Sequence, residues 1–278
     1  MLRNLLVHIP TVQSSRPVTD CAVSLAASIG ARLDAVAIGY ESLNAGFVAE
    51  GGGAIAAVME VERERAVERA NAAIAAFEPG AKHAGIAYGT RALSAIPAEA
   101  AEIIGSLARL YDLTIVSQPE LSQPCFDNHI AQAVLFDSGG PVLMVPYIHS
   151  GAFNAGNVAI AWDGSRLAAR ALRDGMPFLA TADNVTVVTV NEDRDAAGEA
   201  SSGDLVDHLS RRGIHARIER LTAERSNIHN AILSSAADNG IDLMIMGGYG
   251  HSRLKERVLG GVTRGMFESM TIPTLMSH

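Results

Sequence analysis

Short apolar runs alternate along this chain with longer segments in which apolar residues recur every three or four positions. The runs are typical of strands buried on both faces of a sheet, and the longer segments are typical of amphipathic helices. In the first part of the chain they predict strands near 3–9, 31–38, 83–88, 112–117 and 141–146, and helices near 15–29, 55–77 and 97–109.

Local signals place several of these boundaries. Gly30 is expected to end the first helix, because glycine readily adopts the left-handed conformation of a helix C-terminus. Residues 40–54, which include Gly51-Gly52-Gly53, are expected to form a loop. The second helix presents an apolar stripe, and Pro79-Gly80 is expected to end it. The stripe consists of Met59, Ala66, Ala70, Ile74 and Phe77.

The second part of the chain repeats the alternation. It predicts strands near 157–162, 185–190, 214–220, 242–247 and 273–276, and helices near 165–180, 202–212, 227–239 and 261–270. Strands that alternate with helices of ten or more residues favour parallel sheets with right-handed crossovers. The fold class predicted is therefore α/β.

Three landmarks indicate that the two parts are copies of one unit. Asn4-Leu5-Leu6-Val7 matches Asn157-Val158-Ala159-Ile160, Asp112-Leu113 matches Asp242-Leu243, and Pro141-Val142-Leu143-Met144 matches Pro273-Thr274-Leu275-Met276. They recur in the same order, at offsets of 153, 130 and 132 residues. We interpret the chain as a tandem duplication with domains at 1–148 and 155–278, joined by a linker within 147–156.

Composition limits the partners. The net charge is −8, which argues against nucleic acid and against anionic membranes. No run approaches the roughly 20 apolar residues of a membrane span, so we expect a cytoplasmic protein. Cys21 and Cys125 lack metal-type spacing and are expected to be free, and the nine scattered histidines predict no metal site.

The strongest candidate for binding follows the fourth strand of the second copy. Gly247-Gly248-Tyr249-Gly250 leaves that strand, and Gly260-Gly261-Val262-Thr263 begins the next helix. Glycines let a backbone approach a ligand closely, and the unpaired N–H groups of a helix start suit phosphate. Asp163 follows the first strand of this copy. If the strand order is 3-2-1-4-5, Asp163 and the glycines flank one crevice at the reversal of strand order.

Two readings of Asp163-Gly164-Ser165 remain open at this point. The carboxylate of Asp163 can accept a hydrogen bond from an adenine amino group or a sugar hydroxyl, or the segment is only a turn with Ser165 as a helix cap. Charge favours an anion near the glycines. Residues 247–272 hold four basic and two acidic side chains, whereas the equivalent residues 117–141 hold three acidic and no basic ones.

This Gly-x-x-Gly pattern, followed after nine residues by further glycines, resembles the nucleotide-binding loop of the universal stress protein family. The resemblance covers essentially the whole chain as a tandem member. It implies two doubly wound, parallel, five-stranded sheets of the adenine-nucleotide alpha-hydrolase-like type. It also implies a site for ATP, ADP or AMP, with Asp163 at the adenine, Gly247 and Gly250 at the ribose and phosphates, and Gly260, Gly261, Val262 and Thr263 at the phosphate end.

The chain departs from the family pattern at defined positions. Gly261 stands where the family has Ser or Thr, and the lost hydroxyl is expected to weaken binding about tenfold. Thr263 is a substitute donor. In the first copy Pro10 aligns with Asp163, and Ser117-Gln118-Pro119-Glu120 replaces the glycines. We therefore predict that the first domain binds no nucleotide in the family's manner.

The leading hypothesis is a nucleotide-binding sensor of stress that acts on a protein partner, with the two domains forming an internal pseudo-dimer and a homodimer left open. The rival is an interaction scaffold with a vestigial site, which Gly261 favours. A slow nucleotide hydrolase is a third option, although no Walker-type lysine or paired carboxylates accompany the glycines. We predict no enzymatic activity, and the sequence does not determine whether Mg²⁺ accompanies the nucleotide.

Overall fold

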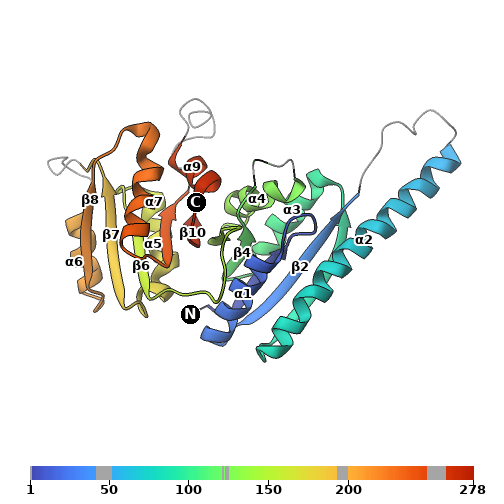
Figure 1. The fold of residues 1–278 in the computed structure, drawn as a ribbon, viewed down its shortest axis with the longest axis horizontal. Helices are drawn as coiled ribbons and strands as arrows, with labels where there is room; N and C mark the ends of the chain where they lie inside the picture. The colour runs from blue at the N-terminus through green and yellow to red at the C-terminus, as the bar shows by residue number, and fades with distance from the viewer. Residues whose placement is uncertain (1, 42–51, 121, 123–124, 193–199, 249–260) are drawn as a thin grey trace.

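One twisted sheet of ten strands runs through the whole molecule (Figure 1), in the order β3-β2-β1-β4-β5-β10-β9-β6-β7-β8. The computed structural model describes residues 2–41, 52–120, 122, 125–192, 200–248 and 261–278. Each half of the sheet has its own five strands in the order 3-2-1-4-5, as the sequence predicts. The α/β fold class with doubly wound halves is thereby confirmed.

The first half contains strands β1 (Asn4–Ile9), β2 (Arg32–Tyr40), β3 (Tyr88–Ala95), β4 (Leu113–Ser117) and β5 (Val142–Val145), and helices α1 (Arg16–Ile29), α2 (Gly52–His83), α3 (Pro97–Ala108) and α4 (Ile130–Asp137), with a short 3-10 turn η2 (Phe126–His129) before α4. All strand pairs within this half are parallel.

The second half contains strands β6 (Asn157–Ala161), β7 (Asn184–Val190), β8 (Ala216–Leu221), β9 (Leu243–Gly247) and β10 (Thr274–Ser277), and helices α5 (Arg166–Leu179), α6 (Ser202–Ser210), α7 (Ile228–Asp238) and α9 (Val262–Ser269), with a 3-10 turn η3 (Arg225–Asn227) before α7. These strands are also parallel to one another.

The two halves join at their fifth strands. β5 and β10 pair antiparallel, and Leu143 lies opposite Leu275. These two leucines are equivalent in the repeat, so a local pseudo-twofold axis passes through this pair. The two predicted five-stranded sheets are thus one continuous sheet, because each fifth strand covers the open edge of the other. The C-terminus consequently lies at the centre of the molecule (Figure 1).

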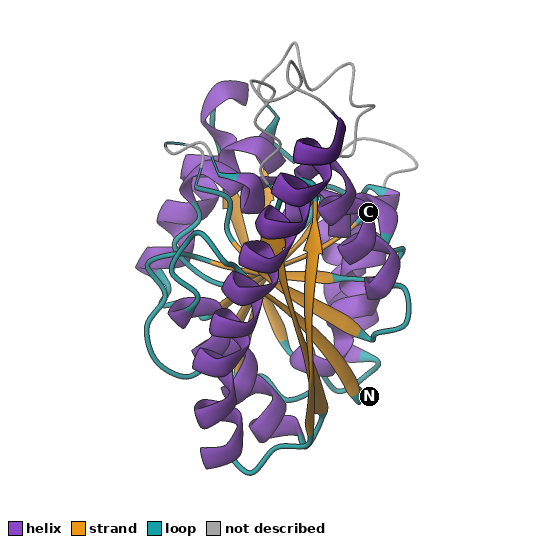
Figure 2. Cartoon of the chain, turned by 90° about the vertical axis from the view of Figure 1, so that its right-hand side faces the viewer, coloured by secondary structure: helices purple, strands orange, loops and turns teal. Residues whose placement is uncertain are grey.

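Helices cover both faces of the sheet (Figure 2). Alternate strand residues point to opposite faces, so Leu5 and Val7 pack with α1 and α2, whereas Leu6 packs with α3 and α4. The same division holds in the second half, with α5 and α6 on the first face and α7 and α9 on the second. Both cores extend across the β5–β10 junction, which makes the two halves one packed body.

A repeated contact explains one pair of landmarks in the sequence. Asp112 accepts hydrogen bonds from the backbone N–H of Arg3 and Asn4 at the start of β1, and these bonds lower the pKa of its carboxyl. Asp242 accepts in the same way from the N–H of Asn157 at the start of β6. Each aspartate thus ties the start of the fourth strand of its half to the start of the first.

The structure corrects the sequence between the second and third strands. α2 does not end at Pro79-Gly80 but continues to His83, and β3 begins at Tyr88 rather than near residue 83. Beyond the proline the helix is held by Ala81, which is buried in the core, and by an ion pair between Lys82 and Glu78 at 2.9 Å. The start was also misplaced, because α2 begins at Gly52, within the expected loop.

The apolar stripe of α2 is only partly a core stripe. Ala66, Ala70, Ile74 and Phe77 are buried, but Met59 is 47% exposed. The early part of this long helix extends beyond the sheet (Figure 1), so its apolar residues have no strand beneath them. Cys21 is buried within α1, and burial raises the pKa of its thiol to about 12, which keeps it protonated.

Candidate functional site

The predicted crevice lies at the edge of the sheet where the strand order of the second half reverses. β6 and β9 are parallel neighbours, and Ala161 is in register with Met246. The chain therefore leaves both strands at the same level, with Trp162 and Asp163 on one side and Gly247 and Gly248 on the other. This is the reversal point at which doubly wound sheets bind ligands.

Asp163 lies in a tight turn that starts α5. Gly164 has a positive φ of 72°, and the Ser165 hydroxyl caps the helix by accepting from the N–H of Ala168 at 3.1 Å. Asp163 Oδ1 accepts from the N–H of Ser165 at 3.0 Å. This segment thus forms both a turn and a helix cap. It does not use up the carboxylate, because Asp163 is exposed and, among the described residues, its Oδ2 has no hydrogen-bond donor.

Gly247 makes room for protein rather than for open space. A Cβ atom on Gly247 would lie 2.7 Å from the backbone of Leu167 and of Ala168, in the first turn of α5. The absence of a side chain lets α5 pack directly on the end of β9. Gly247 therefore acts first on the geometry of the site, because it brings the turn that carries Asp163 against the strand from which the glycines follow.

The start of α9 is the other part of the predicted site. Gly261 is its N-cap in an extended conformation, with φ −62° and ψ 155° and no side-chain cap. Val262 is half-buried and begins the helix, and Thr263 is buried. Gly250 and Gly260, which the sequence also predicts as site residues, lie outside the described residues.

The first half of the chain lies against Gly248, at the start of the glycine segment, and against the later part of α9. A Cβ on Gly248 would lie 2.9 Å from the side chain of Leu135 in α4. On the other side, the buried Gln118 donates from Nε2 to the carbonyl of Phe267 in α9 at 2.9 Å. The sequence aligned Gln118 with Gly248 but did not predict this contact, because it depends on the β5–β10 junction.

The equivalent edge of the first half is filled by its own side chains. Asp127, from η2, is buried and accepts from the Tyr40 hydroxyl at 2.6 Å and from the N–H of Val12 at 3.3 Å. His8 Nε2 lies 3.9 Å from Asp127 Oδ1 and is completely enclosed. Burial and the neighbouring Asp127 raise the pKa of Tyr40, so it stays a hydrogen-bond donor. The absence of nucleotide from this half stays a prediction, with a steric reason.

His8 is expected to make stability depend on pH. Burial lowers its pKa from the ordinary 6.5, and the charge of Asp127 only partly opposes this effect. Near pH 6.5, His8 therefore binds a proton in the unfolded chain but not in the folded chain. The contribution of His8 to the free energy of unfolding is therefore fully present above that pH. As the pH decreases further, this contribution is lost by up to about 1.4 kcal/mol per pH unit.

Urea unfolding at about pH 7.5 and about pH 5.5 tests this expectation against a His8→Gln variant. The variant should lose less stability on acidification than the wild type, because glutamine does not titrate. Burial also lowers the pKa of His149, so part of the pH dependence of stability should remain in the variant. An equal loss in both proteins would contradict the role given to His8.

Two other features can be checked in the described part of the chain, metal-binding groups and membrane-spanning helices. No group of three or more His, Cys, Asp or Glu side chains there has a geometry that could hold a metal ion. None of the helices in the same residues is both long and apolar enough to cross a membrane. Both cysteines are free.

Comparison with known proteins agrees with the fold. Residues 155–278 match the model of the Universal stress protein family. Universal stress protein Slr1230 of Synechocystis sp. is 32% identical over 122 residues, which are 42% of this chain and 41% of that protein. Universal stress protein MJ0577 of Methanocaldococcus jannaschii is 40% identical over 48 residues, which are 17% of this chain and 30% of that protein. The matches thus span less than half the length of these curated relatives.

A solved structure extends the likeness to the whole chain. A universal stress protein from Archaeoglobus fulgidus has a TM-score of 0.67 and covers 98% of this chain and 95% of its own, with 16% identity. At this level of identity the likeness shows the fold alone, and both halves share in it.

Proposed function

Because residues 155–278 match the model of the Universal stress protein family, we propose that this half of the chain binds ATP or a related adenine nucleotide, and that occupancy alters how the molecule meets a protein partner under stress. The observation that carries the proposal is the common edge of β6 and β9. It supports the proposal because the turn that carries Asp163 and the end of β9 at Gly247 and Gly248 leave the sheet at the same edge.

Each wall of the crevice has a distinct chemistry. Asp163 Oδ2 is available to accept from an adenine amino group or a ribose hydroxyl. The first turn of α9 offers backbone N–H groups and the positive end of the helix dipole to phosphate. Because Gly261 provides no hydroxyl there, we expect affinity about tenfold below that of a site with serine at this position.

Gly247 contributes through packing, and the other glycines through the space they leave. We assign Gly247 to holding α5 against β9, and Gly261 and Val262 to the phosphate end. We assign Gly250 to the ribose and phosphates and Gly260 to the phosphate end, as the family resemblance implies. Thr263 is buried in the first turn of α9, so we assign it to the support of that turn.

The proposed role is sensing rather than turnover. No lysine or pair of carboxylates among the described residues of the crevice is placed to activate water or stabilise a transferring phosphoryl group. The proposed output is a change in the affinity for a partner protein. After prolonged incubation with ATP, we expect the protein sample to contain no more ADP than a protein-free blank.

Asp163→Asn tests the adenine assignment. The uncharged amide of asparagine has one acceptor oxygen, whereas the carboxylate of Asp163 has two. ATP affinity should therefore fall by roughly tenfold or more. Isothermal titration calorimetry with ATP, ADP and AMP gives the affinity, and repeating it with Mg²⁺ and with EDTA shows whether the metal takes part. Asp207→Asn is the matched control, because it changes another exposed carboxylate, in α6.

The control should bind as the wild type does. If Asp163→Asn also binds as tightly as the wild type, the adenine assignment is wrong, although binding through α9 would survive. If the wild type gives no heat with millimolar ATP and releases no nucleotide on denaturation, the scaffold is the better account. The missing hydroxyl at Gly261 is the observation that favours that rival.

A further inference from the structure

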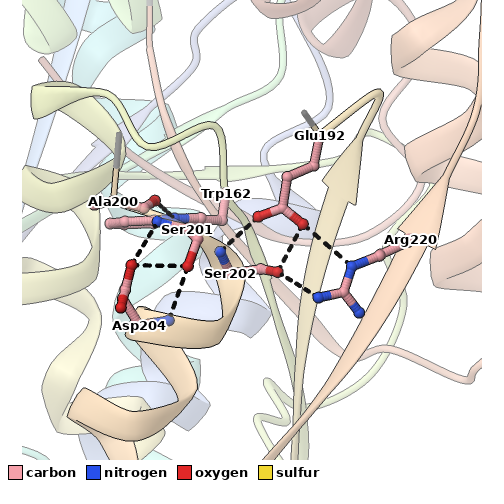
Figure 3. A network of polar contacts seen from close by, with 7 residues as sticks. All are labelled: Trp162, Glu192, Ala200, Ser201, Ser202, Asp204 and Arg220. Carbon is pink, nitrogen blue, oxygen red and sulfur yellow. Dashed lines mark hydrogen bonds and ion pairs between the residues drawn. The ribbon is translucent and has the colours of Figure 1, made fainter. Parts of the chain in front are cut away.

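A polar cluster lies at the carboxyl ends of β7 and β8, close to Trp162 and Ala200 (Figure 3). Glu192 follows β7, and its carboxylate accepts from the N–H of Ser202 at 2.6 Å and from the Ser202 hydroxyl at 2.7 Å. Arg220 in β8 donates to the same carboxylate at 3.2 Å and to the Ser202 hydroxyl at 3.1 Å. We call Glu192, Ser202 and Arg220 the clamp.

The clamp holds the start of α6 at a fixed distance from the sheet. Glu192 is an anion placed at the N-terminus of this helix, where the dipole favours negative charge. Burial alone would raise its pKa, but the hydrogen bonds from Ser202 and the charge of Arg220 outweigh burial and lower the pKa. The carboxylate is therefore ionised near neutral pH, and the clamp consists of charge-assisted hydrogen bonds.

The backbone next to the clamp is also specially shaped. Asn191 is the one non-glycine residue in the described part of the chain with a positive φ, at 55°. Its side chain donates to the carbonyl of Ala223 at 2.6 Å and accepts from the N–H of Ala223 at 3.1 Å. The left-handed conformation costs about 1 kcal/mol, and these two bonds hold it. It turns the chain so that Glu192 faces α6.

Two contacts connect the clamp to Asp163. Ala200, two residues before Ser202, accepts through its carbonyl from the indole N–H of Trp162 at 2.8 Å. The same carbonyl would lie 3.2 Å from a Cβ on Gly164, so it also packs closely on that glycine. Asp163 is the residue between Trp162 and Gly164. The Ala200 carbonyl therefore touches the turn on both sides of the carboxylate.

We propose that Glu192, Ser202 and Arg220 are positioning residues for the nucleotide site, which fix the turn that carries Asp163 through the Ala200 carbonyl. This inference rests on the proposed function. None of the three needs to touch nucleotide, and they act by limiting the orientations of Asp163 before the ligand arrives. Loss of the clamp should weaken binding without changing its stoichiometry.

The chain offers both a direct probe and a matched control. Trp162 is the only tryptophan, so fluorescence reports the contact between Ala200 and the turn without any ligand. Arg217 lies on the same strand as Arg220 and is also exposed. It donates to Thr186 and to Asn239 instead. Arg217→Met thus removes an arginine with two hydrogen bonds from β8 but leaves the clamp intact.

Arg220→Met should shift the Trp162 emission to longer wavelength and weaken ATP binding by roughly threefold to tenfold, at one nucleotide per chain. Arg220→Lys should restore part of both signals, since lysine keeps the charge near Glu192. Glu192→Gln should reproduce Arg220→Met from the other side of the pair, and it replaces that variant if Arg220→Met fails to fold. Arg217→Met should change neither signal.

The two readouts separate this inference from the proposed function. If the wild type binds ATP and Arg220→Met and Glu192→Gln bind equally well, the positioning role is wrong and the nucleotide site stands. Equal losses in Arg217→Met and Arg220→Met would also overturn it, because they indicate a general effect on β8. If the wild type binds no ATP, both proposals fail. An unchanged Trp162 emission in both clamp variants would by itself reject the connection to the turn.

Discussion

Gly39→Ala is expected to destabilise the protein by about 3 kcal/mol or more. Gly39 lies in β2, directly beneath α2, and a Cβ atom there would overlap the backbone carbonyl of Ala66. No side-chain rotation relieves this overlap, because the Ala66 carbonyl is part of the main chain and a Cβ atom is fixed to it. Either α2 must move away from the sheet or β2 must bend, and each change opens the core around Ala70 and Ile74.

Gly80→Ala is the control for this substitution. Gly80 lies within the same helix, and a Cβ there meets no atom within 4 Å. Alanine should raise stability by about 0.5–1 kcal/mol, because it favours the helix more than glycine does. Urea unfolding followed by circular dichroism gives both values. A Gly39→Ala protein as stable as the wild type would contradict the close packing of α2 on β2.

Gly247→Ala should have the second-largest effect, on stability and on binding together. The added Cβ would lie 2.7 Å from the backbone in the first turn of α5. Because backbone atoms cannot rotate away, α5 must shift, with an expected cost of about 2–3 kcal/mol. The shift also displaces the turn that carries Asp163, so ATP affinity should fall by roughly tenfold or more.

Gly203→Ala separates this effect from the general consequences of a methyl group. Gly203 lies in the first turn of α6, and a Cβ there would make only an ordinary contact of 3.6 Å with the Ser201 hydroxyl. This variant should keep the wild-type stability to within about 1 kcal/mol and the wild-type affinity. If Gly247→Ala is folded, stable and binds ATP normally, then Gly247 does not set the geometry of the crevice.

Much of the fold was predictable because it repeats a local pattern. Buried strands read as apolar runs, the crossover rules predict parallel sheets, and the order 3-2-1-4-5 is what the family resemblance implies. The landmark pair Asp112 and Asp242 recurs because each aspartate makes the same contact with the first strand of its half. The end of α2 was missed because a local breaker, Pro79, is outweighed by the burial of Ala81.

The site was predictable where it depends on topology alone. The reversal of strand order places Asp163 and Gly247 at one edge before any side chain is considered. The role of Gly247 was not predictable in the same way, since a glycine that faces a ligand and one that faces a helix look alike in sequence. Gln118 and the clamp were missed because their contacts join segments far apart in the chain, and no periodicity connects Glu192 with Arg220 or Gln118 with Phe267.

A calorimetric titration of ATP into the nucleotide-free wild-type chain tests the central claim most directly. The account predicts saturable binding with one nucleotide per chain, because we propose one site between Asp163 and the start of α9, and Asp127 fills the equivalent edge of the first half. Two nucleotides per chain would contradict the closed first half. No binding at millimolar ATP would contradict the nucleotide site itself.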